Sequence, residues 1–388
     1  MKILFLNHNV AWRGGFFRAY HWGRHLAQRG HQVTVMTISE SSKWKFEVQE
    51  RDGIQLIKTP DWFSGRLRSG WDLYDTVRRI LYLLPRTFDL VHSVDSRPVC
   101  ILPAIILKKL TGVKLVLDWG DWWGRGGSIT ERAGNLTDLL FSPIETFFEE
   151  GFRQWANGSV VLSSVLERRA IALGVAPAKI IRIPHGADVE GIRPLERSAA
   201  RHVVGLSDEA HVIGYVGLMF KRDADLLIRA FEIIREQDNS IRLFLIGNTN
   251  VEVPRQLIDS GAVVLTGRIS YESLKQYIAS CDVMLLPLKN SVANRGRWPS
   301  KVSDYLASGK AVVASRVGDV AALIEEGQCG VLAEDSPEDF ASKTLEVLRH
   351  PDWVDEMGRN ARRVAETKLD WRLLTDQLEQ FYLRIMSA

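Results

Sequence analysis

Two arginines and a lysine lie close together in the stretch NRGRWPSKVSDYLASGKAVVAS, residues 294–315. Arg295, Arg297 and Lys301 come just before and at the start of a short amphipathic segment, which a glycine turn and an apolar strand follow. The first N–H groups of a helix have no partner inside the helix, so this end already attracts anions. Cations added at the same place predict a bound phosphate that carries negative charge during the chemistry.

A second basic pair follows a short apolar strand in VIGYVGLMFKRDADLL, residues 212–227. Lys221 and Arg222 come shortly after Gly217, where the strand gives way to a helix. A cation at the start of a helix opposes the helix dipole, so this placement favours a functional role. The alternative is a pair of charges that simply face solvent.

The segment DWGDWWGRGG, residues 118–127, combines carboxylates with tryptophans directly after a predicted strand. Asp118, Trp119, Asp121 and Trp122 are the candidate residues. An indole face can stack on a sugar ring, and a carboxylate can bind hydroxyl groups or remove a proton. We expect a pocket for a sugar or an acceptor here; the alternative is a loop that its own tryptophans pack.

Two further positions in the first half of the chain are candidates for a pocket. Gly14 and Gly15 lie between the first strand and the first helix, where a phosphate or sugar could approach the backbone. Their spacing does not fit a dinucleotide fingerprint, and a purely structural tight turn is the alternative. His92, at the end of DLVHSV, is equally consistent with a pocket residue and a buried histidine.

Both halves of the chain alternate short apolar strands with helical segments, which predicts parallel sheets covered on both faces. A polar stretch with Gly and Pro near residues 186–200 predicts the boundary between two doubly wound domains. We therefore expect one domain over residues 1–190 and a second over residues 191–369. A final amphipathic segment covers residues 370–388. Sites in such sheets lie at the carboxyl ends of the strands.

Composition excludes several classes of protein. The 388 residues carry 50 basic and 47 acidic side chains, a net charge of +3, which gives no reason to expect nucleic acid as a partner. The three cysteines are far apart, so neither a metal site nor a disulfide framework is predicted. The chain shows neither a signal peptide nor a long apolar run. We expect a cytoplasmic protein without a metal.

The segment of residues 62–88 interleaves aromatic side chains with arginines. This combination suits a peripheral contact with a membrane surface, here on the inner face. The alternative is a mobile loop and a helix packed on the edge of the domain.

Several stretches in the right order resemble one family. GG…R…LAQRGHQVTVMT, then SVVLSS…KIIRIPHGADVEGIRP, then GYVG…LLIRAF are similar to the retaining glycosyltransferases of the GT-B fold. This large family includes many glycan, lipopolysaccharide and phosphatidylinositol mannosyl transferases, and the resemblance covers nearly the whole chain. It implies an α/β fold of GT-B type, with two Rossmann-like domains facing a cleft. The first domain would hold the acceptor, the second the nucleotide sugar, and the last helix would pack back on the first domain.

The family's donor signature is a Glu, seven residues and a second Glu. In the family the second Glu binds the ribose, and Asp304 stands at its position. The first Glu contacts the sugar, and Gly296 stands at its position. Asn290, Asn294 or Arg295 could take over that contact with the sugar. Asp304 could instead be a solvated helix residue. Arg222 matches the family's usual lysine after the first strand of the second domain, and Asp223 stands where a glycine is usual.

The resemblance, with the candidates above, gives three sets of predicted site residues. The donor-binding set is Gly217, Lys221, Arg222, Asn294, Arg295, Arg297, Lys301 and Asp304. The catalytic set is Asp121, Lys301 and Arg222. The set around the acceptor or sugar is Gly14, Gly15, His92, Asp118, Trp119 and Trp122.

The function that the resemblance implies is transfer of a sugar from a nucleoside-diphosphate sugar to a hydroxyl acceptor, with retention of configuration. UDP or GDP is the expected nucleotide, and no cofactor is expected. In this mechanism no protein nucleophile takes part, and the leaving phosphate assists deprotonation of the acceptor. The alternatives are a nucleotide-sugar hydrolase or epimerase of the same fold, and a non-catalytic protein that binds nucleotides or carbohydrates.

Overall fold

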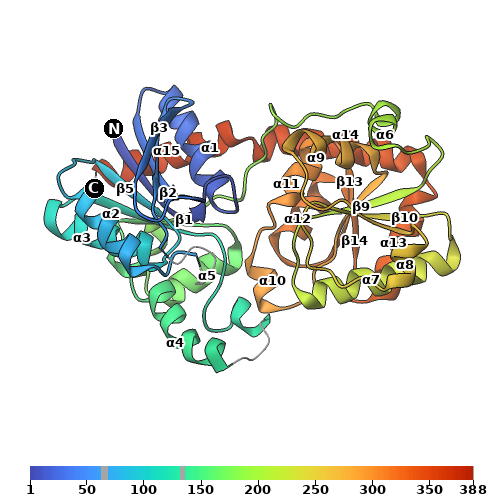
Figure 1. Ribbon diagram of the computed structural model, residues 1–388, viewed down its shortest axis with the longest axis horizontal. Coiled ribbons are helices and arrows are strands. Elements are labelled where there is room, and N and C mark those ends of the chain that lie inside the picture. Colours follow the sequence, from blue (N-terminus) through green and yellow to red (C-terminus); the bar gives the residue numbers. More distant parts are fainter. Residues whose placement is uncertain (63–68, 132–135, 388) are drawn as a thin grey trace. The chain divides into compact units, whose positions relative to one another are not determined.

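The computed structural model describes residues 1–62, 69–131 and 136–387, which form two compact units (Figure 1). Unit 1 consists of Met1–Pro184 and Trp371–Ala388, and unit 2 of His185–Asp370. The polar stretch near residues 186–200 predicts a boundary after residue 190, whereas the units divide after Pro184. Backbone contacts explain this position, because Arg18 of unit 1 binds the carbonyl of Pro184, while Ala187 N–H donates to Leu369 O within unit 2.

Unit 1 contains an eight-stranded sheet in the order β3-β4-β2-β1-β5-β6-β7-β8. Neighbouring strands are parallel, except that β3 and β4 are antiparallel. The strands are β1 (Lys2–Val10), β2 (Gln32–Ile38), β3 (Glu47–Arg51), β4 (Ile54–Thr59), β5 (Leu90–Val94), β6 (Lys114–Trp119), β7 (Gly158–Val161) and β8 (Ile180–Arg182). The helices are α1 (Phe16–Gln28), α2 (Leu73–Leu83), α3 (Pro98–Thr111), η1 (Ser128–Glu131), α4 (Leu136–Glu150), η2 (Arg153–Trp155), α5 (Ser164–Ala172), η3 (Pro177–Lys179) and α15 (Trp371–Ser387).

The sheet of unit 1 has an apolar core on each face. On one face, α1 and α15 pack together through residues such as Trp22, Leu378 and Phe381. On the other face, α3 supplies buried side chains such as Ile101 and Leu107. Figure 1 shows α1 and α15 on one side of the sheet and α2 and α3 on the other. The apolar strands are covered on both faces, as parallel strands require.

Unit 2 contains a parallel six-stranded sheet in the order β11-β10-β9-β12-β13-β14. Its strands are β9 (Val212–Val216), β10 (Arg242–Ile246), β11 (Val263–Leu265), β12 (Val283–Leu286), β13 (Ala311–Ser315) and β14 (Gly330–Ala333). Its helices are α6 (Arg197–Val204), α7 (Lys221–Gln237), α8 (Arg255–Asp259), α9 (Tyr271–Ser280), α10 (Val292–Gly296), α11 (Lys301–Ala307), α12 (Gly318–Gly327), α13 (Pro337–Leu348), α14 (Pro351–Val364) and the π-helix η4 (Ala365–Leu369).

The sheet of unit 2 is likewise covered by helices on both faces. Figure 1 shows α7, α8 and α13 on one side of it and α9, α11 and α14 on the other. Leu227 and Phe231 of α7 pack with Phe340 and Leu345 of α13 in one core against the strands. The predicted α/β class with two doubly wound, Rossmann-like domains is therefore confirmed. Among the described residues, no helix is both long and apolar enough to cross a membrane.

Candidate functional site

The carboxyl ends of β9 and β12 bring the predicted donor residues of unit 2 together. These strands are neighbours in the sheet, and the chain continues from β9 into α7 and from β12 into α10 and α11. Gly217 makes the turn after β9 with φ +77°, and its N–H donates to Ile246 O at 2.8 Å. A residue with a side chain rarely adopts this φ, so glycine fits the turn.

Asp223 is the centre of a buried network at this edge. Its Oδ1 accepts hydrogen bonds from Lys289 N and from Asn294 Nδ2, both at 2.8 Å. Arg297 Nη2 lies 3.4 Å from Oδ2. A fully buried carboxylate requires such donors. Asp223, which stands where the family usually has a glycine, therefore connects α7 to the chain around α10.

Asn294 and Arg297 keep unpaired polar atoms inside this network. Asn294 Nδ2 also donates to Lys289 O at 2.9 Å, so the orientation of the amide is fixed by two acceptors. Asn294 Oδ1 and Arg297 Nε are buried without a hydrogen-bond partner among the described residues. The Arg297 guanidinium lies 4.3 Å from the centre of the Phe220 ring. Buried polar atoms without partners are uncommon, and they mark places where a ligand or water completes the bonding.

Lys301 lies at the start of α11, beside the turn after β9. Its Nζ donates to Leu218 O at 2.8 Å and to the hydroxyl of Tyr215, whose ring centre is 3.9 Å away. Burial, followed by the nearby Arg297 cation, lowers the pKa of Lys301 well below its ordinary value. A bound anion would favour the charged ammonium form. The site is thus suited to an anionic group.

Asp304 lies one turn further along α11. Burial, together with the neighbouring carboxylate of Asp188, raises the pKa of Asp304 to about 7. The Tyr271 hydroxyl donates to Asp188 Oδ2 at 3.4 Å. Asp304 is half-buried and lies beside a second carboxylate, that of Asp188. It is therefore not the freely solvated helix residue of the alternative interpretation. Carboxylate oxygens of this kind can accept hydrogen bonds from vicinal hydroxyls.

The remaining predicted cations of unit 2 have exposed side chains. Lys221 and Arg222 begin α7, and Arg295 lies in α10. They belong to the segments that meet at this edge. A diphosphate role for these three residues stays a prediction.

In unit 1, Asp118 is the buried partner of an arginine. Arg18 Nε donates to Asp118 Oδ2 at 2.7 Å, and Nη2 to Oδ1 at 3.3 Å. The same guanidinium donates to the carbonyls of Ile183 and Pro184 at 2.9 and 2.8 Å. Both carboxylate oxygens of Asp118 are therefore committed to holding α1 to β6 and the chain end of unit 1. These contacts give Asp118 a structural role, in contrast to the predicted pocket position.

Trp119 is also enclosed rather than presented to a pocket. Its indole Nε1 donates to Glu149 Oε1 at 2.9 Å, and the Arg153 guanidinium covers its ring at 4.0 Å. Glu149 further accepts from the backbone N–H groups of Trp123 and Gly124 at 2.7 and 2.6 Å. With one ring face covered and the side chain buried, Trp119 has no open surface on which a sugar could stack.

Trp122 and Asp121 lie in the loop after β6 and are more accessible. Trp122 Nε1 donates to Arg125 O at 2.9 Å, and its carbonyl accepts from Ser128 N–H at 2.7 Å. Gly127 packs so closely that an added Cβ would lie 2.1 Å from the Trp122 carbonyl oxygen. The side chains of both residues are half-buried. This loop is thus shaped by its own tryptophans, yet it leaves these two side chains at the carboxyl edge of the sheet.

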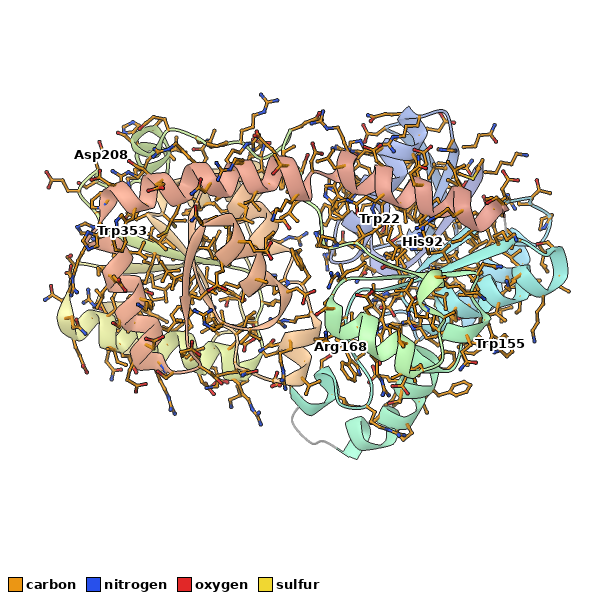
Figure 2. All side chains as sticks on the ribbon, turned by 180° about the vertical axis from the view of Figure 1, so that it is seen from behind. Trp22, His92, Trp155, Arg168, Asp208 and Trp353 are labelled. Atoms are coloured by element: carbon orange, nitrogen blue, oxygen red, sulfur yellow. The ribbon has the colours of Figure 1, made fainter. Side chains whose placement is uncertain are left out.

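His92 lies in the core of unit 1. Figure 2 labels His92 and Trp22 in this unit. The His92 ring is 5.2 Å from the rings of both Phe5 and Trp22, and its Nδ1 contacts the Tyr382 hydroxyl of α15. Burial lowers the pKa of His92 to about 3. These surroundings match the alternative of a buried histidine, in contrast to the predicted pocket residue.

Gly14 and Gly15 turn the chain from β1 into α1. Gly14 has φ +51°, and a Cβ added at Gly15 would lie 2.8 Å from Asn9 Oδ1. The turn therefore packs against the side chain of Asn9, which fits the structural alternative. It still lies at the carboxyl end of β1, where a ligand can approach.

Other features of the described residues add nothing to the predicted sets of site residues. No group of three or more His, Cys, Asp or Glu side chains among them could hold a metal ion. Two open hollows in unit 2, of about 570 and 480 Å³, are lined by residues outside the predicted sets. Neither hollow contains the Asp223 network.

Sequence reasoning missed several residues that organise these sites. Asp223 carried a signal, because it departs from the usual glycine of the family. Tyr215, Glu149 and Arg18 carried none, since their partners are distant in the chain and only the fold brings them together. Their roles could be found only from contacts.

Comparisons with known proteins agree with this architecture. Residues 12–190 match the family described as Glycosyltransferase Family 4, and residues 210–350 match the family described as Glycosyl transferases group 1. Together the two matches cover more than half of the chain.

Curated relatives carry the name D-inositol 3-phosphate glycosyltransferase. The protein of Saccharomonospora viridis is 26% identical over 229 residues, which are 55% of this chain and 52% of the relative. That of Stackebrandtia nassauensis is 29% identical over 205 residues, 49% of this chain and 44% of the relative. The chain thus spans about half the length of these relatives.

Solved structures share the fold over nearly the whole chain. Sucrose-phosphate synthase from Thermosynechococcus elongatus has a TM-score of 0.78 at 16% identity, covering 100% of this chain and 99% of its own. Anabaena Alr3699/HepE in complex with UDP has a TM-score of 0.72 at 16% identity, with coverages of 99% and 100%. WaaG, a glycosyltransferase involved in lipopolysaccharide biosynthesis, has a TM-score of 0.68 at 19% identity, with coverages of 97% and 98%. The two family matches and the shared fold show that the chain belongs to the glycosyltransferases of the GT-B fold.

Proposed function

We propose that this protein transfers a sugar from a nucleoside-diphosphate sugar to a hydroxyl acceptor, with retention of configuration. The observation that carries the proposal is the cation cluster of unit 2. Arg297 and Lys301 lie at the carboxyl ends of β9 and β12, where the buried carboxylate of Asp223 holds Arg297. Fixed cations in a water-poor site stabilise the charge that develops on a leaving diphosphate.

Each residue of this edge has a chemical role in the proposal. Arg297 and Lys301 bind the diphosphate oxygens, and Asp304 accepts hydrogen bonds from the ribose hydroxyls. Asn294 Oδ1, which has no hydrogen-bond partner among the residues that the structure describes, offers an acceptor for a hydroxyl of the donor sugar. As the bond from the anomeric carbon to the diphosphate breaks, the acceptor oxygen bonds to that carbon, and the diphosphate takes up the hydroxyl proton.

The substrates to test first follow from chemistry and from the relatives. UDP and GDP are the expected nucleotides, and one structural neighbour was solved with UDP-glucose. The curated relatives are named for D-inositol 3-phosphate, so this compound is the first acceptor to test. No cofactor or metal takes part in the proposed reaction, and unit 1 would hold the acceptor.

Replacement of Lys301 tests the proposal. We expect Lys301→Ala to lower kcat by about a hundredfold or more, because a charge that stabilises the transition state is lost. Its free energy of unfolding should change far less than its activity. Lys343→Ala, which removes a lysine from an exposed ion pair with Glu346, is the matched control. Wild-type turnover in purified Lys301→Ala would remove Lys301 from the mechanism.

The same assay separates the proposal from its rivals. A hydrolase or epimerase would consume the nucleotide sugar at full rate without an acceptor. A non-catalytic binding protein would bind the nucleotide sugar and never consume it. Transfer that requires an added hydroxyl acceptor supports the transferase alone.

We further propose that α2 rests on the cytoplasmic surface of an anionic membrane. Leu73, Val77 and Leu81, four residues apart on one face of α2, are 67%, 53% and 61% exposed. Arg78 lies on the same helix and Arg86 follows its end, and an apolar stripe with nearby arginines favours the boundary of an anionic lipid layer. Phe63, Arg66 and Arg68 of the predicted segment lie outside the described residues.

A further inference from the structure

A hollow of about 480 Å³ lies at the amino ends of β12 and β13 in unit 2. Its lining includes Asp282, which directly precedes β12, and Lys310, which directly precedes β13. The first residue of α6 and part of α14 complete the wall, and Figure 1 shows both helices along the upper side of this unit. The proposed donor site lies at the carboxyl ends of β9 and β12. This amino-edge hollow is therefore a separate place at the opposite edge of the same sheet.

The walls of the amino-edge hollow are held by hydrogen bonds and close packing. Arg362 of α14 donates to the carbonyls of Val189 and Ile192 at 2.9 and 2.8 Å. It also donates to the carbonyl at the end of α11 at 2.8 Å. Gly358 packs so closely on the turn after α11 that an added Cβ would lie 2.5 Å from Gly309 O. The hollow is thus a feature of the packed fold and not a gap between surface side chains.

Cations outnumber carboxylates around the amino-edge hollow. Four cationic side chains and two carboxylates line it, which are Arg197, Lys310, Arg359, Arg362, Asp282 and Asp355. The Asp282 carboxylate is already neutralised within the fold, since the buried Arg201 donates to both of its oxygens at 2.9 Å. Arg197 donates to one of them at 2.7 Å. Asp282 therefore does not offset the charges of Lys310 and Arg359, and the hollow keeps a positive potential that attracts anions.

Lys310 has one hydrogen-bond donor left for a ligand. Its Nζ donates to the carbonyls of Ala279 and Cys281 at 2.6 and 2.7 Å. An ammonium group has three N–H donors, and no third acceptor is bonded to this one within the described part of the chain. Burial lowers the pKa of Lys310 to about 8, although Cys281 and Asp282 act in the opposite direction. A bound anion would compensate the buried charge and favour the ammonium form.

Two further side chains of the lining have polar atoms without partners among the described residues. Arg359 of α14 is exposed and makes no ion pair or side-chain hydrogen bond there. Ser308 is 4% exposed, and its Oγ is buried without a hydrogen-bond partner. Buried polar atoms usually have a partner, so an unpaired hydroxyl at a hollow indicates that a ligand or water completes its bonding. A hydroxyl and a guanidinium can both donate to anionic oxygens.

We propose that the amino-edge hollow binds a small phosphorylated molecule through its phosphate group. Lys310 and Arg359 donate to the phosphate oxygens, and the Ser308 hydroxyl donates a further hydrogen bond. Hydrogen bonds from cations to phosphate oxygens are among the strongest that side chains form. The site is independent of the proposed function, because it shares no residue with the donor edge of unit 2.

The size of the hollow favours a phosphorylated molecule over the free ion. Its volume of about 480 Å³ falls in the range of sites for small molecules, about 300–1,000 Å³, and exceeds what a phosphate ion occupies. Pro194, Leu195 and Val354 add apolar surface to the lining. The organic part of the ligand can lie against these side chains while its phosphate contacts the cations.

Calorimetric titration of the intact protein tests the site. Inorganic phosphate, glycerol 3-phosphate and glycerol would be titrated into wild type, Arg359→Ala, Ser308→Ala and Arg255→Ala. We expect saturable binding of both phosphates and none of glycerol. Arg359→Ala should lower the affinity about tenfold or more, because a charge-assisted hydrogen bond is lost, and Ser308→Ala should lower it several-fold. Arg255→Ala, which removes an exposed arginine of α8 from its pair with Asp259, should bind as wild type does.

A further variant separates the hollow from the donor edge. Phosphate could also bind beside Arg297 and Lys301, and about 10 Å of helix α11 separates Lys301 from Ser308. We expect Arg297→Ala to keep the phosphate binding that Arg359→Ala weakens. The reverse pattern, with binding lost in Arg297→Ala and unchanged in Arg359→Ala, would place the phosphate at the donor edge and overturn the proposal.

Two other results would overturn the site. They are the absence of saturable binding of either phosphate to folded wild type, and unchanged affinity in folded Arg359→Ala. Thermal unfolding shows whether each variant is folded. Arg359 is exposed, so its replacement should leave the fold intact and keeps the test open if Ser308→Ala does not fold. Tighter binding of glycerol 3-phosphate than of phosphate would support a phosphorylated molecule as the ligand, whereas equal affinities would support a site for free phosphate.

Discussion

Arg18 and Asp118 illustrate how residue types suited to chemistry can serve the fold instead. Both side chains are buried in unit 1 and bonded to each other, and Arg18 also donates to the backbone carbonyls of Ile183 and Pro184. In unit 2, by contrast, the buried charge of Asp223 contacts Arg297, whose Nε has no hydrogen-bond partner in the described part of the chain. The difference lies in whether a buried charge leaves polar atoms unsatisfied, because such atoms are available to bond a ligand.

We therefore expect Asp118→Asn to affect the stability of the fold more directly than it affects the acceptor site. Removing one partner of a buried ion pair leaves the other charge uncompensated, so we expect a loss of about 3–5 kcal/mol in the free energy of unfolding. Urea titration followed by circular dichroism measures it. Glu40→Gln, which breaks the exposed pair of Arg13 and Glu40, should cost about 0–1 kcal/mol. Similar small losses in both variants would contradict the structural role of Asp118.

At the residue scale, sequence reasoning succeeded where position along a strand or helix decides the environment. Arg297 and Lys301 were expected close to the start of a short helix, and they lie just before α11 and at its first residue; their role in a donor site stays a prediction. Trp119 and His92 also end or occupy strands, but Glu149 and Tyr382 enclose them from distant parts of the chain. The sequence does not show that these distant residues become neighbours, so the burial of Trp119 and His92 could not be predicted from it.

At the element scale, amphipathic patterns predicted helices better than they predicted what the helices pack against. The last segment was recognised as amphipathic, and α15 packs on α1 through Trp371, which stacks on His21 at 5.2 Å. Gly158 of β7 allows this packing, since an added Cβ would lie 2.4 Å from Ile385 Cδ1. Only the family resemblance indicated the first domain as the partner of this helix. The pattern of its own residues did not.

The exposed stripe of α2 gives a prediction at the same scale. We expect the triple variant Leu73→Ser, Val77→Ser, Leu81→Ser to bind vesicles of phosphatidylglycerol and phosphatidylcholine much more weakly than wild type, because about 25 cal/mol is lost per Å² of buried apolar surface. Vesicle sedimentation measures the bound fraction. Ile171→Ser, which changes an exposed apolar residue of α5, is the matched control. Equal binding by wild type and the triple variant would exclude α2 as the membrane contact.

At the scale of the whole molecule, the alternation of strands and helices predicted two α/β domains, and both are present with their own sheets. The polar stretch of residues 186–200 gave only an approximate position for the boundary between the two units. The actual division follows single contacts, those of Arg18 to Pro184 and of Ala187 to Leu369. Such contacts depend on the folded arrangement, which a composition shift along the chain does not reveal.

The central claim is that unit 2 binds a nucleoside diphosphate through Arg297, Lys301 and Asp304. Calorimetric titration of the intact protein with UDP, GDP and ADP tests it most directly, with Arg297→Ala and Asp304→Ala as variants and Lys343→Ala as the control. We predict binding of one diphosphate with a Kd on the order of micromolar, or about −8 kcal/mol. Binding should be lost in both variants and kept in the control. Folded wild-type protein that binds none of the three nucleotides would contradict the account.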